Sequence, residues 1–311
     1  MPKFSANLTM MFTENDDPVA RIGDAADAGF GAVEYIFIYD LDPGEIGRAM
    51  KDAGLAMSVI NIAVGEGVKM GPLVAAAPGK RAAFLENLEA AKRYCGELRP
   101  TGLVVPAYTP PDGVSKSEAL PVFSENMEIA SEALAALGIP VLIEALNPDI
   151  RPNSLLTTTN EVKAFIDEIG HPNLGIEYDA YHCYVTEGCT SAGDMAATIE
   201  AHLDLIGNIQ IADVPGRNEP GTGTIDHDAL FGALDKMGYD KWVAAEYEPS
   251  GGTLETLGWR DGWLPGSCLP ARRYLGLNWR SRDWLADYAA AAVQQSRTVA
   301  IIEPISMGLV I

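Results

Sequence analysis

Four strand-like runs in the second half of the chain end close to a side chain that carries a hard oxygen atom. The side chains are Glu144, Asp179, Gln210 and Glu246. A short run of aliphatic and β-branched residues indicates a buried strand, and a carboxylate is rarely buried without a partner. Carboxylate and amide oxygens are the ligands that Mg²⁺ and Mn²⁺ prefer. The repeated pattern therefore predicts one divalent metal ion, Mg²⁺ or Mn²⁺, bound by these four residues.

The elements that must position these side chains alternate between strand and helix along the chain. Strand-like runs start near Phe4, Ala32, Ala56, Gly102, Pro140, Leu174, Ile206 and Trp242, with a helical segment after each of the first seven. Such alternation indicates parallel βαβ units, and eight strands predict a (β/α)8 TIM barrel over residues 1–263. An open doubly wound sheet would need a glycine-rich phosphate loop after the first strand, and residues 12–16 do not provide one. Barrel strands carry their working groups at their carboxyl ends, so closure should direct all four side chains to one centre.

The segment after Trp263 does not continue this pattern. Residues 264–279 are basic and aromatic, and residues 281–296 have the spacing of a helix. We expect residues 264–311 to form a C-terminal extension that packs on the barrel or on a neighbouring subunit. Its role and the oligomeric state stay open, and a homo-oligomer is compatible with the sequence.

Composition narrows the classes of partner. The formal net charge of −21 opposes binding to nucleic acid, which depends on Lys and Arg meeting phosphates. The chain contains no run of 18 apolar residues and no signal-peptide pattern, so we expect a cytoplasmic protein without a membrane span. The four cysteines, Cys95, Cys183, Cys189 and Cys268, lack the spacing of a zinc site and are expected to be free thiols.

Several phrases of the sequence resemble one enzyme family. They are Phe4–Leu8, Gly31–Tyr35, Leu142–Pro148, Tyr178–His182 and Gln210–Arg217. In combination they are similar to the hydroxypyruvate isomerases, which belong to the xylose isomerase-like barrel superfamily, and the resemblance runs from about Phe4 to Trp263.

The resemblance implies a metal-dependent isomerase that interconverts hydroxypyruvate and tartronate semialdehyde by proton transfer through an enediolate. It implies the metal ligands named above, with Glu144 and Glu246 as the paired catalytic acid and base in an order that stays open. His182, three residues after Asp179, is expected to bind the substrate or support the metal. The carboxylate of a small hydroxy-keto acid needs a cation, and the candidates are Arg217 and then Lys69. The other three histidines, His171, His202 and His227, are expected at the surface.

Related activities remain as alternatives. A 2-oxo-tetronate isomerase would use the same residues, and so would a ketose 3-epimerase acting on a sugar, although those epimerases mostly carry His where Gln210 stands. A phosphodiesterase of the endonuclease IV kind would need a histidine-rich zinc cluster and a basic groove, and this chain has four His and a net charge of −21. A non-catalytic barrel that only binds a sugar acid would have no use for both Glu144 and Glu246.

Overall fold

The computed structural model describes residues 1–63 and 73–264. The compact unit that contains the barrel runs from Met1 to Trp259. Lys69 and the extension from residue 265 onward lie outside the described residues, so the predictions for them remain predictions.

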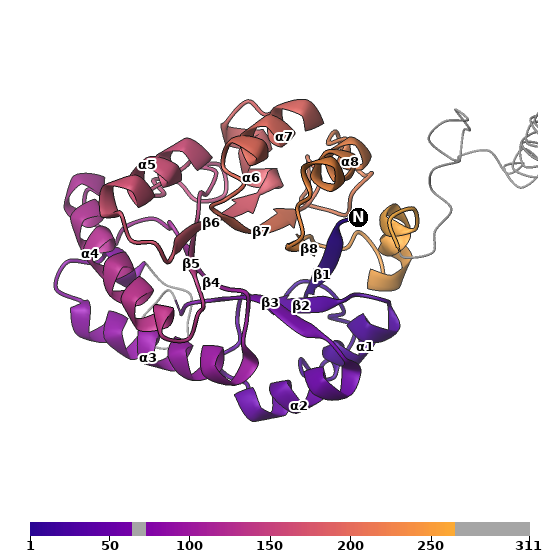
Figure 1. Ribbon diagram of the computed structural model, residues 1–311, viewed down its shortest axis with the longest axis horizontal. Coiled ribbons are helices and arrows are strands. Elements are labelled where there is room, and N and C mark those ends of the chain that lie inside the picture. Colours follow the sequence, from indigo (N-terminus) through magenta and orange to yellow (C-terminus); the bar gives the residue numbers. More distant parts are fainter. Residues whose placement is uncertain (64–72, 265–311) are drawn as a thin grey trace, which may run out of the picture. The chain divides into compact units, whose positions relative to one another are not determined.

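Eight parallel strands form a closed barrel in chain order, which confirms the predicted fold (Figure 1). The strands are β1 (Lys3–Asn7), β2 (Ala32–Tyr35), β3 (Ala56–Asn61), β4 (Gly102–Pro106), β5 (Val141–Glu144), β6 (Leu174–Asp179), β7 (Ile206–Ile211) and β8 (Trp242–Ala245). The first strand pairs with both β2 and β8, and this pairing closes the barrel.

Helices surround the barrel and connect successive strands (Figure 1). They are α1 (Arg21–Asp27), α2 (Pro43–Ala53), α3 (Arg81–Leu98), α4 (Lys116–Ala135), α5 (Thr159–Ile169), α6 (Ala180–Thr186), α7 (Ala192–Ala201) and α8 (His227–Met237), with short 3₁₀ helices η1 (Val74–Ala76) and η2 (Thr253–Arg260). Local sequence signals define many of their ends. The side chain of Asp226 accepts a hydrogen bond from the Ala229 amide at the start of α8, and Gly54 and Gly238 end α2 and α8 with positive φ.

One leucine fills the amino-terminal half of the barrel interior. Leu142 of β5 is fully buried in a cluster with Val59 and Val104. Glycines on β4 and β7 make room for it, because a Cβ atom would lie 2.5 Å from Leu142 Cδ1 at Gly102 and 2.4 Å from Leu142 Cδ2 at Gly207. One large side chain facing several glycines gives the close packing that a narrow barrel requires.

The carboxyl-terminal half of the interior is polar. Alternate residues of a strand share one face, so Glu177 lies on the same face as Asp179, and Asn208 on the same face as Gln210. All four are buried. The register pairs Asp179 with Gln210 across β6 and β7, which brings two of the predicted metal ligands side by side.

Candidate active site

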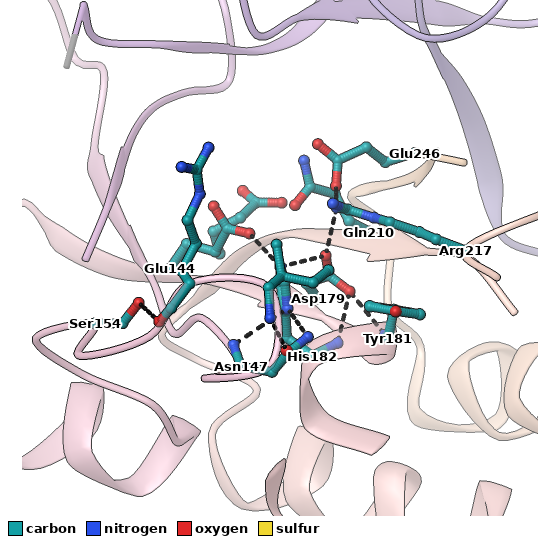
Figure 2. A network of polar contacts seen from close by, with 12 residues as sticks. Glu144, Asn147, Ser154, Asp179, Tyr181, His182, Gln210, Arg217 and Glu246 are labelled. Atoms are coloured by element: carbon teal, nitrogen blue, oxygen red, sulfur yellow. Dashed lines mark hydrogen bonds and ion pairs between the residues drawn. The ribbon is translucent and has the colours of Figure 1, made fainter. Parts of the chain in front are cut away.

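The four predicted metal ligands lie at the carboxyl end of the barrel. Glu144 and Asp179 are the last residues of β5 and β6, Gln210 lies in β7, and Glu246 follows β8 directly. Their exposed fractions are only 5, 5, 2 and 5%. Asp179, Gln210 and Glu246 gather in one polar network with Arg217 and His182 (Figure 2). Barrel closure thus brings these side chains together at one centre.

One oxygen of the Asp179 carboxylate caps a helix, and the other faces this centre. Asp179 Oδ1 accepts hydrogen bonds from the backbone amides of Tyr181 at 2.7 Å and His182 at 3.1 Å, and thereby caps α6. Asp179 Oδ2 lies 3.2 Å from Arg217 and 3.4 Å from His182 Nε2. The cap fixes the side chain, so its second oxygen is held in position to bind a cation.

Gln210 presents an amide oxygen in the same region. Its Nε2 donates to Glu34 Oε1 at 3.2 Å, whereas its Oε1 is buried and has no hydrogen-bond partner among the described residues. A buried polar atom without a partner costs about 1–3 kcal/mol, so such an atom needs an explanation. An oxygen ligand held for a hard cation provides that explanation, and the donor set therefore fits the predicted metal.

Glu144 and Glu246 are both buried carboxyl groups with a raised pKa. Burial raises the pKa of Glu144 well above its ordinary value, and the neighbouring charges of Glu246 and Asp179 add to the effect. Burial likewise raises the pKa of Glu246 to about 8, although Arg217 opposes this shift. A carboxyl group whose pKa is raised holds a proton more readily, and a pair of such groups can accept and return a proton, which is what an acid and base pair requires.

His182 is held in one tautomer by Asn147. His182 Nδ1 lies 2.7 Å from Asn147 Nδ2, and the backbone N–H of Asn147 also donates to it. Because Asn147 Oδ1 accepts from the Ile150 amide, the amide nitrogen must face His182. These contacts make Nδ1 an acceptor and leave the proton of the neutral ring on Nε2.

The Nε2 atom of His182 points into the site. It lies 3.6 Å from Glu144 Oε1 and 3.4 Å from Asp179 Oδ2. Burial lowers the pKa of His182 to about 4, with Asp179 opposing and Arg217 adding to the shift. One oxygen of Glu144, one of Asp179 and one His182 nitrogen lie within 4.8 Å of one another, a spacing that could hold a metal ion. Since Nε2 carries the proton, we interpret His182 as a hydrogen-bond donor to the site, with the carboxylates as ligands.

A loop organised by one aspartate positions Arg217. Asp213 is fully buried, and its carboxylate accepts backbone hydrogen bonds from Val214, Gly221, Gly223 and Ile225. Glycine is required at position 223, because a Cβ atom there would lie 2.1 Å from the Val214 carbonyl oxygen. The Arg217 carbonyl oxygen accepts a hydrogen bond from Glu248 at 2.9 Å, which ties the loop to the segment after β8.

The Arg217 guanidinium lies among the predicted metal ligands. It forms ion pairs with Asp179 Oδ2 and Glu246 Oε2, and its Cζ lies 5.5 Å from the centre of the Tyr181 ring (Figure 2). Burial alone would lower the pKa of Arg217, but the carboxylates of Glu246 and Asp179 outweigh burial and raise it. The arginine is therefore charged and partly neutralises the acidic centre.

Other histidine predictions had mixed outcomes. His171 and His202 are half-buried, on segments away from this centre. The surface prediction for His227 was wrong: its exposed fraction is 5%, and its Nδ1 lies 3.1 Å from the Ile225 carbonyl oxygen. The same nitrogen lies 3.9 Å from Oδ2 of Asp213, the residue that organises the loop of Arg217.

A layer of buried polar side chains lies beneath the centre, and Asn7, Glu177 and Asn208 in this layer were not assigned a role from the sequence. It contains Asn7, Glu34, Glu177 and Asn208, none of them more than 1% exposed. The signal for two of them was present, since Glu177 and Asn208 each precede a predicted ligand by two residues and so face the same side of their strand.

Comparison with known proteins defines the class. Residues 22–263 match the family described as Xylose isomerase-like TIM barrel, and this chain belongs to that family. A 2-oxo-tetronate isomerase of Cupriavidus necator is 36% identical over 265 residues, which cover 85% of this chain and 99% of that protein. The hydroxypyruvate isomerase of Escherichia coli is 35% identical over 261 residues, or 84% of this chain and 99% of that protein. These matches confirm the expected enzyme class, and the chain is an isomerase of this family.

Solved structures support the same fold. A crystal structure described as AP endonuclease, family 2 from Brucella melitensis has a TM-score of 0.77 and 32% identity, and the match covers 85% of this chain and all of that one. A D-allulose 3-epimerase from Methylomonas sp. in complex with D-allulose has a TM-score of 0.65 at 20% identity, covering 83% of this chain and 88% of that chain, a likeness of fold alone. Among the described residues no helix is long and apolar enough to span a membrane.

Proposed function

We propose that this chain is a hydroxypyruvate isomerase that interconverts hydroxypyruvate and tartronate semialdehyde through an enediolate. The observation that carries the proposal is the pairing of two buried carboxyl groups, Glu144 and Glu246, with the unpartnered amide oxygen of Gln210 between their strands. Proton transfer next to a carbonyl needs an acid and base pair together with a group that stabilises negative charge on oxygen.

Glu144, Asp179, Gln210 and Glu246 would bind one divalent ion, Mg²⁺ or Mn²⁺. The donors are carboxylate and amide oxygens, which such hard cations prefer over zinc or copper. When bound, the ion would polarise the substrate carbonyl and stabilise the charge that develops on its oxygen. The spacing of Glu144 and Asp179 also supports a site here, since an oxygen of each lies within 4.8 Å of the other.

The proton is moved by the two glutamates. One carboxylate removes the hydrogen from a substrate carbon, and the other carboxyl group returns a hydrogen to the adjacent carbon. The pKa of Glu246 is raised to about 8 and that of Glu144 is also raised, so both groups hold a proton more readily than an exposed glutamate does. His182 donates from Nε2 to a substrate oxygen, and Asn147 keeps it in the tautomer able to do so.

Arg217 would bind the carboxylate of the substrate. Its guanidinium now pairs with Asp179 Oδ2 and Glu246 Oε2, the same oxygens that we assign to the metal. A guanidinium suits bidentate binding of a carboxylate, and Arg217 would be available to the substrate when these oxygens hold the ion. Lys69 remains a second candidate for this role, outside the described residues.

A substrate panel tests the proposal. Hydroxypyruvate, 2-oxo-tetronate and neutral ketoses are offered separately in D₂O, and NMR follows both conversion and deuterium incorporation at carbon. We expect turnover of the hydroxy-keto acids, loss of activity with a chelator, and recovery with Mn²⁺ or Mg²⁺. A preference for neutral ketoses would contradict the role of Arg217, and full activity in chelator would contradict the metal.

A 2-oxo-tetronate isomerase is the second candidate, because a relative with that name is 36% identical over most of the chain. The same acid and base pair and the same carboxylate anchor would serve it, and the relative rates in the substrate panel decide between the two. DNA with an abasic site belongs in the panel as a negative control. We expect no cleavage of this DNA. Among the described residues, His182 is the only histidine grouped with Glu144 and Asp179, and the net charge of −21 opposes binding to nucleic acid.

We propose that residues 264–311 contribute nothing to the chemistry. The family match ends at residue 263, and each ligand assigned above precedes it. A chain that ends at Trp263 should therefore turn over substrate at the rate of the full chain. Loss of activity by a folded, truncated protein would show that the extension contributes to the site.

A further inference from the structure

A buried glutamate contacts the proposed metal site from below. Glu34 of β2 is 1% exposed, and its Oε1 accepts hydrogen bonds from Asn7 Nδ2 at 2.9 Å and from Gln210 Nε2 at 3.2 Å. Gln210 is the one neutral member of the proposed ligand set. Its amide is also the one ligand group whose two ends differ chemically, since one end is an acceptor oxygen and the other a donor nitrogen.

The contact with Glu34 decides which end of that amide faces the site. A carboxylate only accepts hydrogen bonds, so the nitrogen of Gln210 must face Glu34 and the oxygen must face the other way. The oxygen is indeed buried without a partner among the described residues. In the reverse orientation, two oxygens would meet at Glu34 and an N–H₂ group would face the carboxylates of the site in place of a ligand.

Asn7 connects Glu34 to Glu246 through hydrogen bonds. Its Nδ2 donates to Glu34 Oε1 and lies 3.3 Å from Glu246 Oε1, so a single nitrogen bridges the two carboxylates. The orientation of Asn7 is itself fixed, because its Oδ1 accepts from the Thr9 amide at 3.0 Å. Glu34, Asn7, Gln210 and Glu246 thus form one hydrogen-bonded set that joins β1, β2 and β7 to the residue after β8.

We propose that Glu34 is a positioning residue that fixes the amide orientation of Gln210 and, through Asn7, the carboxylate of Glu246, so that both present oxygen to the metal. This inference rests on the metal site of the proposed function. It goes further in assigning Glu34 a role in preparing the ligands, although Glu34 itself touches neither substrate nor cation. Partners of this kind typically change metal affinity by about 10–100-fold when they are replaced.

The barrel offers a matched control in Glu177. This residue is also 1% exposed, and its Oε1 accepts from Asn208 Nδ2 at 2.7 Å rather than from a proposed ligand. Glu34→Gln and Glu177→Gln each replace one buried carboxyl group of the same layer by an amide. The first alone gives position 34 an N–H₂ group, which can pair with the oxygen of Gln210 and turn its amide around.

The experiment measures Mn²⁺ affinity by electron paramagnetic resonance of the free ion, with no substrate present. We expect Glu34→Gln to weaken binding about 10–100-fold, and at least about tenfold more than Glu177→Gln. The exchange variant Glu34→Gln with Gln210→Glu keeps the total charge and supplies an oxygen at both ends of residue 210. It should therefore recover most of the lost affinity.

The outcomes separate the inference from the proposed function. Failure of the unmodified protein to bind Mn²⁺ would remove the metal site and with it the basis for any role of Glu34. Mn²⁺ binding by the unmodified protein, with equal affinity in Glu34→Gln and Glu177→Gln, would overturn the positioning role alone, as would an exchange variant no better than Glu34→Gln. Thermal unfolding accompanies each measurement, and unfolding of both position-34 variants would make Glu34 structural and also overturn the inference.

Discussion

Glu246→Gln is the perturbation that tests the proposed chemistry most directly. Glutamine has nearly the same shape, but its amide cannot take up or release a proton near neutral pH. The carboxyl group it replaces is 5% exposed, and burial raises its pKa to about 8. A positioned general base contributes about 10² to 10⁴ in rate, so we expect kcat to fall by that factor, or about 3–5 kcal/mol in the barrier.

The same variant should leave the fold almost unchanged. Removing one partner of a fully buried ion pair costs about 3–5 kcal/mol, but Arg217 keeps its contact with Asp179 and its side chain is 21% exposed. The loss is also offset because a neutral amide replaces a buried carboxylate that burial disfavours. These effects oppose each other, and we expect the midpoint of thermal unfolding at pH 8 to shift by only a few degrees.

The assay follows conversion of hydroxypyruvate and its deuterium incorporation in D₂O by NMR. Glu248→Gln is the matched control, because Glu248 is exposed and lies two residues further along the chain. It should behave like the unmodified protein. If Glu246→Gln keeps more than about a tenth of kcat with an intact fold, the residue is not part of the proton transfer and our assignment is refuted.

Three further perturbations test separate parts of the structure. Asn147→Asp should make His182 Nδ1 a hydrogen-bond donor and remove the proton from Nε2, so we expect kcat to fall by about 10²-fold. ¹⁵N NMR of the imidazole ring reports the tautomer, and unchanged chemical shifts would contradict our assignment. Gly207→Ala should destabilise the fold by about 1–3 kcal/mol in chemical denaturation, because its Cβ would lie 2.4 Å from Leu142 Cδ2. In the presence of a chelator, the free energy of unfolding should fall as pH rises from about 4.5 to about 8. The raised pKa of Glu246 is the cause, because the folded state keeps a proton that the unfolded chain releases in this range. A midpoint of thermal unfolding that does not depend on pH would contradict this prediction.

Local signals in the sequence were sufficient to predict most of the elements. The glycines that end α2 and α8 and the aspartate cap of α8 can be recognised from residue type alone, because each acts on its own turn of helix. The short helix α6 is harder to recognise from the sequence. It follows β6 without a loop and is capped by Asp179, so the strand, the cap and the ligand coincide in one residue.

The candidate site was predicted at the level of which residues meet, and not at the level of how they are arranged. Strand ends indicated the four ligands, but strand stagger sets their heights, and Glu144 pairs in register with Glu177 rather than with Asp179. The burial of His227 and the ion pairs of Arg217 depend on the path of the loop after β7. That path is set by tertiary hydrogen bonds to Asp213, which no local pattern reveals.

The charge balance of the barrel interior links the metal to the acid and base chemistry. Five carboxyl groups are buried near the centre, Glu34, Glu144, Glu177, Asp179 and Glu246, and Arg217 is the cation that pairs with them among the described residues. Burial raises the pKa of each of the four glutamates, which means that their charged forms are disfavoured in this interior unless a cation compensates them. A divalent ion would compensate the negative charge of these carboxylates, and this would favour its binding at the site. The same burial favours protons on Glu34 and Glu246 near neutral pH, so the proposed metal binding and the proposed proton transfer would have one physical origin.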